Sequence, residues 1–238
     1  PPAGVRPGTA IYDSKPAVLD VVKFVGGELV PFDGDADDIK SPIFDLESGT
    51  RIVIGKLAKM GVDDAKAAVE AAAAAWDKGQ GVWPRMPLAK RIEAIEALVV
   101  ELLKVRESIV NVLMWEIGKN SGDAAKEFDR TMQFVEAVIK ALRSDPSVGQ
   151  EYSEWTDVSG TTVRVRRGPL GVMLGLAPFN YPLNEMYAML IPSLLMGNTA
   201  VLKLPAIGGL AHVLTAHAFM KVLTLTLALT LTLTLTLT

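Results

Sequence analysis

The apolar positions of the chain are densest in Gly168–Pro205, where two short runs flank a longer helical pattern. Gly171–Leu176 and Thr199–Lys203 consist mainly of apolar or small residues, which is typical of strands buried on both faces. Between them the pattern predicts a helix over Asn184–Met196, ended by Gly197–Asn198. A strand, a helix and a strand joined by short links predict a βαβ unit with two parallel strands.

The region before this unit has the 3.6-residue period of amphipathic helices. We expect four helices: one from near Asp63 to Trp76, one from Pro87 to Val105, one over Glu107–Ile117 that ends at Gly118, and one from Gly122 or Asp123 to Leu142. Their predicted buried faces are Val69, Ala72, Ala73 and Trp76; Ile92, Ile95, Leu98, Leu102 and Val105; and Phe128, Met132, Val135, Ile139 and Leu142. On the other face of the last helix, Glu127 and Arg130 are predicted to be solvated charges.

Shorter β-prone segments flank the helices. After a loosely held arm over residues 1 to about 18, Val21–Val30 predicts a hairpin around a Gly-Gly turn, and Asp33–Asp38 a solvated loop. Arg51–Ile54 predicts a strand. Thr161–Arg166 alternates polar and apolar residues, so we expect a half-exposed strand whose edge is available to a second subunit.

The end of the chain has a different pattern. From Leu223 onward Leu and Thr alternate without charge, proline or turn residue. A strand of this kind has one Leu face and one Thr face, and its edge is prone to aggregate. An inter-subunit strand is one interpretation, and an artificial low-complexity ending is the favoured one. Residues 221–238 are therefore left out of the functional prediction.

Composition narrows the class of protein. A chain of 238 residues can bury a core of its own. The net charge of −3 and the lack of a basic run argue against a nucleic-acid partner. The absence of cysteine excludes disulfides, thiolate catalysis and cysteine zinc sites, and no metal site is expected. With no signal-peptide pattern at the start and no 18-residue apolar run before Lys221, we expect a cytoplasmic α/β protein without a membrane partner.

Candidate chemistry lies at the carboxyl ends of the two predicted parallel strands. The first strand leads into Pro178–Pro182, and the second ends in Lys203. Ligands of open α/β sheets bind in the crevice at these strand ends. The two prolines restrict the loop between them, which suits a loop that aims the Asn180 side chain. The alternative is that Asn180 merely satisfies a turn.

The motif Pro178-Phe-Asn-Tyr-Pro182, followed by Gly197-Asn-Thr199 and Lys203, resembles the aldehyde dehydrogenase superfamily. The resemblance extends over Phe24–Phe219. The first motif and Lys203-Leu-Pro205 are most similar to the non-phosphorylating, NADP-dependent glyceraldehyde-3-phosphate dehydrogenases. The resemblance implies an α/β fold: the N-terminal part of a Rossmann-type cofactor domain with a parallel sheet, plus a protruding oligomerisation-type strand segment.

The domain boundaries follow from this resemblance. Residues 1–143 would form an arm, a hairpin and the helical part of the cofactor domain, and residues 144–168 the oligomerisation segment. Residues 169–220 would form the βαβ cofactor-binding unit, and residues 221–238 are the Leu/Thr tail. A homo-oligomer is implied for the intact family member.

The resemblance also implies roles for particular residues. Asn180 would stabilise the oxyanion of an aldehyde that is oxidised to an acid. Lys203 would bind the adenosine ribose and, in NADP users, its 2′-phosphate. Many relatives that prefer NAD carry glutamate three residues later, where this chain has Ala206, so NADP is favoured over NAD. The remaining implied site residues are Ala177, Pro178, Phe179 and Pro205 for the cofactor, and Arg130 and Tyr181 for the substrate, with Arg130 on a substrate phosphate.

Several family features are absent from these 238 residues. The nucleophilic cysteine, the general-base glutamate and the second cofactor segment have no match, so no thiohemiacetal can form and the chain is predicted to be inactive. His212 and His217 are expected to be partly buried helix residues and not catalytic bases. A non-enzymatic assembly module is the alternative. A phosphate-binding βαβ protein of another family is disfavoured because G-x-G-x-x-G and a Walker loop are both missing.

Overall fold

The computed structural model describes residues 15–16, 21–144, 153–226 and 231–234. The predicted arm before residue 15 and the segment 145–152 lie outside the described residues. The molecule is a mixed α/β structure built on one five-stranded sheet. The strands lie in the order β2 (Glu28–Pro31), β1 (Val22–Val25), β9 (Leu231–Thr234), β8 (Thr199–Lys203) and β7 (Val172–Leu176).

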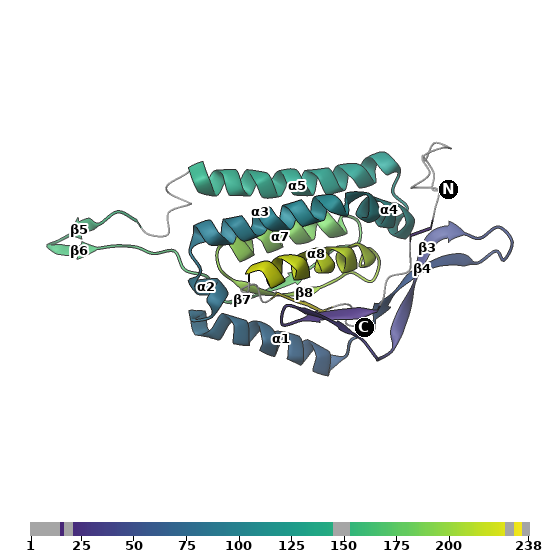
Figure 1. Cartoon of the computed structure of the whole chain (residues 1–238), viewed down its shortest axis with the longest axis horizontal. Helices are drawn as coiled ribbons and strands as arrows, with labels where there is room; N and C mark the ends of the chain where they lie inside the picture. Colours follow the sequence, from purple (N-terminus) through teal and green to yellow (C-terminus); the bar gives the residue numbers. More distant parts are fainter. Residues whose placement is uncertain (1–14, 17–20, 145–152, 227–230, 235–238) are drawn as a thin grey trace.

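The helices cover the sheet in layers, as Figure 1 shows. Helix α1 (Val62–Trp76) lies on one face, and α7 (Pro182–Leu195) and α8 (Leu210–Thr226) lie on the other. Beyond these two come α3 (Leu88–Lys104), α4 (Arg106–Ile117) and α5 (Ser121–Ser144). The four predicted helices before the βαβ unit are confirmed, with ends within a few residues of those expected. Between α1 and α3 lie a 3₁₀ turn, η1 (Asp77–Gly79), and the short helix α2 (Val82–Arg85).

The predicted βαβ unit is confirmed. Strands β7 and β8 pair in parallel from Val172↔Thr199 to Leu176↔Lys203, and α7 connects them. Asn198 fixes the return from helix to strand. Its side-chain oxygen accepts the backbone N–H groups of Leu170 at 2.6 Å and Gly171 at 2.9 Å. Its side-chain amide donates to the Ser193 carbonyl at 3.0 Å, so one residue ties the end of α7 to the start of β7.

The prediction that both parallel strands are buried on both faces is wrong for β7. Strand β8 is interior and almost fully buried, but β7 is the last strand of the sheet. Leu174 and Leu176 are 64% and 68% exposed, because α1 packs Ala68 and Ala72 against Val201 of β8 and does not extend over them. The opposite face of β7 is covered by α7.

The buried face of α1 also differs from the predicted one. Val69 is 51% exposed and Ala73 is exposed, whereas Ala68 and Ala72 are fully buried. The small alanine side chains let the helix backbone come close to the sheet, where the Thr199 hydroxyl donates to the Ala72 carbonyl at 2.9 Å. The small side chains permit this close backbone approach, and the approach explains why Ala68 and Ala72 form the buried face. The predicted buried faces of α3 and α5 are confirmed, with Val105 only partly buried.

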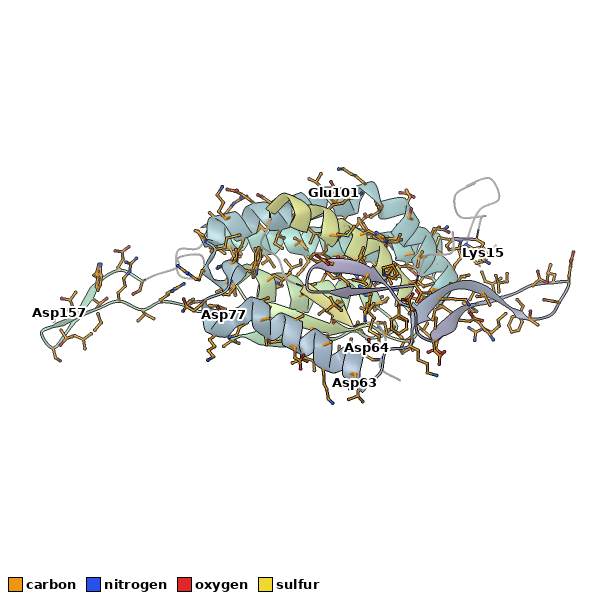
Figure 2. The ribbon with its side chains drawn as sticks, turned by 60° about the horizontal axis from the view of Figure 1, so that its bottom comes forward. Lys15, Asp63, Asp64, Asp77, Glu101 and Asp157 are labelled. Atoms are coloured by element: carbon orange, nitrogen blue, oxygen red, sulfur yellow. The ribbon has the colours of Figure 1, made fainter. Side chains whose placement is uncertain are left out.

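Two hairpins extend from opposite ends of the molecule (Figure 1). One pairs β3 (Ala36–Phe44) with β4 (Arg51–Ala58), so the loop predicted over Asp33–Asp38 is wrong from Ala36 onward. The other pairs β5 (Thr156–Val158) with β6 (Thr161–Val163), and Figure 2 shows Asp157 at its tip, far from the helices. The predicted strand over Thr161–Arg166 is thus shorter and already has a partner in its own chain. The hairpin predicted over Val21–Val30 is confirmed as β1 and β2.

The Leu/Thr tail does not form a free edge strand. Helix α8 runs without a break from Leu210 through Leu223 to Thr226, so the first residues of the tail are helical. Strand β9 then lies inside the sheet, parallel to β8 and antiparallel to β1. The predicted exposed edge is therefore wrong for Leu231–Thr234. Among the described residues, no helix is long and apolar enough to cross a membrane.

Candidate functional site

The carboxyl ends of β7 and β8 bring two loops together, as the sequence predicted. The backbone N–H of Ala177 donates to the carbonyl of Lys203 at 3.2 Å, so the loop after β7 begins beside the last residue of β8. Farther along, Gly208 packs against Pro182. A Cβ atom on Gly208 would lie 2.8 Å from Pro182 Cγ, and the φ of Gly208 is +96°, so glycine alone fits this approach. The two loops form one surface.

The predicted site residues occupy this surface with different exposure. Asn180 is exposed, and no hydrogen bond to its side chain is found among the described residues, so its amide group is open to a ligand. The other loop positions are Ala177 and Pro178, half-buried; Phe179 and Tyr181, 63% and 43% exposed; Lys203, half-buried; Pro205, buried; and Ala206, exposed. No ion pair joins Lys203 to a carboxylate within the described ranges. Its ammonium group is thus free to bind an anionic group of a cofactor.

Glu127 is the main departure from the sequence prediction. The sequence predicts that this residue of α5 is solvated, but Glu127 is 1% exposed. Its side chain lies against the first turn of α7. Its carboxylate accepts the backbone N–H groups of Leu183 at 3.0 Å and Asn184 at 3.3 Å. It also forms an ion pair with Lys119, whose side chain is 13% exposed. Glu127 is buried because three partners replace the water that a carboxylate requires.

A second buried glutamate occupies the start of α8. Glu116 is 1% exposed, and its carboxylate accepts the N–H groups of Gly208 at 2.7 Å and Leu210 at 3.2 Å. Burial raises the pKa of Glu116 to about 7, although the hydrogen bonds from Gly208, Leu210 and Gly209 act in the opposite direction. Desolvation therefore outweighs the backbone donors, and the group titrates close to neutral pH.

These two carboxylates decide where an anionic ligand can lie. Helix N-termini carry unpaired N–H groups and partial positive charge, so they often bind phosphates. At α7 this position is taken by Glu127, and at α8 it is taken by Glu116. The N–H groups at these two helix N-termini are therefore occupied by carboxylates, and Lys203 is a cation at the carboxyl end of β8.

The two histidines, His212 and His217, differ in burial. His212 is 1% exposed, and its Nε2–H donates to the Pro182 carbonyl at 3.1 Å. Burial lowers the pKa of His212 to about 4, with the hydrogen bond to Pro182 opposing the shift, so the ring is neutral at pH 7 and holds the loop in place. It is more deeply buried than predicted. His217 is exposed, not partly buried.

Arg130 lies on α5, exposed to solvent, three positions after Glu127. Because Glu127 contacts the first turn of α7, Arg130 lies about one helical turn from the contact between α5 and the Asn180 loop. The solvated character predicted for Arg130 is confirmed. Its predicted role on a substrate phosphate stays a prediction.

Sequence reasoning missed Glu116, Lys119 and Glu127. The period of α5 contains the signal for Glu127, because Ala124, Thr131 and Val135 lie three, four and eight positions away and all are buried. A charged residue within a buried face requires a partner. No such signal marks Lys119, since its contact with Glu127 depends on how α4 and α5 turn into one another. Among the described residues, no group of three or more His, Cys, Asp or Glu is placed to hold a metal ion.

The fold and the candidate site define a mixed α/β protein in which two loops come together at the carboxyl ends of a parallel strand pair. Comparison with known proteins identifies the family. The model of the aldehyde dehydrogenase family matches residues 37–225, which is more than half of the sequence. The chain belongs to the aldehyde dehydrogenase family.

Individual relatives agree with this assignment. The NADP-dependent glyceraldehyde-3-phosphate dehydrogenase of Pisum sativum is 32% identical over 150 residues, which cover 59% of this chain and 29% of the relative. The protein of the same name from Streptococcus equinus is 31% identical over 141 residues, with 59% and 30% covered. Similar folds occur in lactaldehyde dehydrogenase from Escherichia coli (TM-score 0.77, 21% identity) and HpcC from Thermus thermophilus (TM-score 0.78, 18% identity).

The chain spans only part of these proteins. The structural matches cover 93% and 96% of this chain but 43% and 41% of the two solved chains. The solved structures are below 25% identity and support the fold alone. Family membership and the mixed α/β fold are thereby established, while the substrate and the choice between NAD and NADP require separate arguments.

Proposed function

We propose that the chain supplies the adenosine-binding strand end and the oxyanion donor of an NADP-dependent aldehyde dehydrogenase. The observation that carries the proposal is the parallel register of β7 and β8. Because Leu176 lies opposite Lys203, the loop that carries Asn180 begins beside Lys203, at the carboxyl ends of the two strands. In this proposal, residues 169–220 are the cofactor-binding unit of a Rossmann-type domain.

Lys203 and Ala206 support NADP over NAD. Lys203 is half-buried and free of ion pairs in the described part of the chain, and Ala206 offers no carboxylate to repel a phosphate. Ala177, Pro178 and Phe179 on one side and Pro205 on the other would border the cofactor. When bound, the nicotinamide accepts the hydride from the aldehyde carbon. The relatives from Pisum sativum and Streptococcus equinus are named NADP-dependent, which supports this choice.

Asn180 would bind the oxygen of the aldehyde group. Its exposed amide N–H can donate to that oxygen as negative charge develops on it, and one such donor contributes about 2.7–4 kcal/mol to a transition state. Tyr181 and Arg130 would contact the rest of the substrate, Arg130 as the partner of a phosphate group. The substrate class is therefore a glyceraldehyde-phosphate type of aldehyde.

The 238 residues contain no cysteine, so they cannot form the thioester through which an aldehyde would be oxidised. We expect the purified chain to bind NADP weakly and to show no aldehyde turnover. Isothermal titration with NADP tests the binding, with Lys203→Ala as the variant and Lys140→Ala, on the exposed side of α5, as the matched control. Tight binding that survives Lys203→Ala would refute the Lys203 role, and measurable turnover would refute the predicted inactivity.

An assembly role is the second candidate, supported by the β5–β6 hairpin. The hairpin extends away from the helices (Figure 1), and Trp155, Val158 and Val165 along it are 65%, 54% and 66% exposed. Exposed apolar side chains on a projecting hairpin favour contact with a second copy of the chain. This assigns residues 144–168 to homo-oligomer formation. Size exclusion of Trp155→Asp should show a smaller species than the unchanged protein, and an unchanged elution volume would contradict it.

A further inference from the structure

We propose that Lys119 and Glu127 are positioning residues for the Asn180 loop: Lys119 holds the Tyr181 ring, and Glu127 holds the first turn of α7. The consequence for ligand binding rests on the proposed function of Asn180, whereas the positioning itself depends only on the contacts described. The Glu127 side chain is fully buried and that of Lys119 is 13% exposed, so we infer that both act through the loop that they contact.

The geometry begins with the boundary between loop and helix. Tyr181 precedes the first residue of α7, at the position where Ser, Thr, Asp or Asn normally caps the helix. Tyrosine makes no side-chain cap here. Glu127, from a different helix, accepts the N–H groups of Leu183 and Asn184 in its place. The end of the Asn180 loop is therefore anchored by α5 and not by its own sequence.

Lys119 adds a second anchor one residue from Asn180. Its ammonium group lies 3.9 Å from the centre of the Tyr181 ring and is also paired with Glu127. A cation this close to an aromatic face attracts the ring electrostatically, and more strongly where water is excluded. The Glu127 carboxylate neutralises Lys119, and Lys119 in turn makes the buried position of Glu127 tolerable. The three groups form one network.

The network is extended by neutral contacts. The Thr131 hydroxyl donates to the Glu127 carbonyl at 2.7 Å, and the Asn184 side-chain amide donates to Thr131 Oγ1 at 3.3 Å. Thr131 is fully buried, so α5 contacts the first turn of α7 through both a carboxylate and a hydroxyl.

Asn180 has no such anchor of its own. With no hydrogen bond to its side chain in the described residues, the direction of its amide depends on the backbone between Pro178 and Pro182. Pro182 is fixed by the His212 donor at its carbonyl, and Tyr181 is fixed by Lys119. Loss of the Lys119 contact would loosen the backbone beside Asn180 and the first turn of α7, while the rest of α7 stays folded.

The first test is spectroscopic, because a ring-current shift reports the contact between Lys119 and the Tyr181 ring directly. With ¹³C-labelled lysine, the ε-methylene signal of Lys119 should lie upfield of the other lysines, since it is over the Tyr181 ring. Tyr181→Leu should return it to the ordinary position. In Lys119→Arg, which keeps a cation at the ring, amide exchange in the loop should match that of the unchanged protein. A Lys119 signal at the ordinary lysine position in the unchanged protein would overturn the proposal.

The second test is local hydrogen exchange. In Lys119→Met and Glu127→Gln, the amides of Leu183 and Asn184 should exchange about tenfold faster, the factor that corresponds to 1.4 kcal/mol. Lys126→Met and Glu136→Gln, which change the same residue types on the exposed face of α5, should leave these rates unchanged. Equal rates in the Lys119 and Glu127 variants and the controls would contradict the proposal. If Lys119→Met does not fold, Glu127→Gln and the ε-methylene signal still decide it.

Titration with NADP separates this proposal from the proposed function. If the lysine signal and the exchange rates behave as expected but no NADP binds, the positioning network stands and the cofactor assignment fails. If NADP binds through Lys203 but the Lys119 signal is ordinary, the cofactor assignment stands and Lys119 and Glu127 are not positioning residues.

Discussion

Two buried ionisable residues beside the site respond to pH in opposite directions. Burial raises the pKa of Glu116 to about 7, above its ordinary value of 4.5. Its contribution to stability is thus present below about pH 4.5 and is lost as the pH rises to about 7. Burial lowers the pKa of His212 from 6.5 to about 4, so its contribution is present above about pH 6.5 and is lost as the pH falls. The two effects oppose each other in the interval they share.

Single substitutions should separate these effects. The free energy of unfolding of Glu116→Gln, minus that of the unchanged protein, should increase from pH 4.5 to 7, because only the unchanged protein loses the Glu116 contribution. The same difference for His212→Gln should decrease over pH 4 to 6.5. Urea unfolding at several pH values measures both. Flat differences for both variants would show that neither group has a shifted pKa.

Gly208 offers a second test at the residue scale. Gly208→Ala should destabilise the protein by about 1–3 kcal/mol through its positive φ, and by more through the contact with Pro182. Gly160→Ala is the matched control, because Gly160 has a φ of +81° and no atom within 4 Å of an added Cβ. Thermal unfolding of the two variants isolates the Pro182 contact. Equal losses would mean that the two loops are not closely packed at Gly208.

At the scale of elements, the sequence predicts what depends on local pattern. The stripe from Phe128 to Leu142 defines the buried face of α5, and the Gly197–Asn198 pair marks the turn between α7 and β8. The exposed face of β7 was not predictable, because an edge strand and an interior strand share the same apolar run. The same limit applies to Glu127, whose neighbours Leu183 and Asn184 come from a helix more than 50 positions away.

Removal of strand β9 tests how the elements of the sheet depend on one another. Since Leu231–Thr234 pairs with β8 on one side and β1 on the other, deletion of residues 227–238 should detach the β1–β2 hairpin. We expect a lower melting temperature and faster exchange of the β1 amides, because β1 would keep only β2 as a neighbour and an isolated two-stranded hairpin is marginally stable. The interpretation of the tail as an artificial ending predicts the opposite result. An unchanged melting temperature and unchanged β1 exchange would support that interpretation.

At the scale of the whole molecule, the sequence motifs and the fold both indicate a site at the carboxyl ends of β7 and β8. Pro178–Pro182 and Lys203 are far apart in the sequence, and the parallel register of β7 and β8 unites them. These motifs carry the resemblance to the family, and the family model that matches residues 37–225 establishes membership. The carboxylates at the starts of α7 and α8 did not follow from them, although they exclude phosphate from both helix N-termini and leave Lys203 as the cation at the strand end.

The selectivity of the chain for a 2′-phosphate tests this account most directly. Ligand-observed NMR at millimolar concentrations can compare 2′,5′-ADP with 5′-AMP, which differ only in that phosphate. We expect the unchanged protein to prefer 2′,5′-ADP, and Lys203→Ala to bind the two ligands equally, because the cation that distinguishes them is gone. Lys140→Ala should retain the preference. A preference for 2′,5′-ADP that persists in Lys203→Ala would contradict the role of Lys203, and equal binding of the two ligands by the unchanged protein would contradict the assignment of this strand end to NADP.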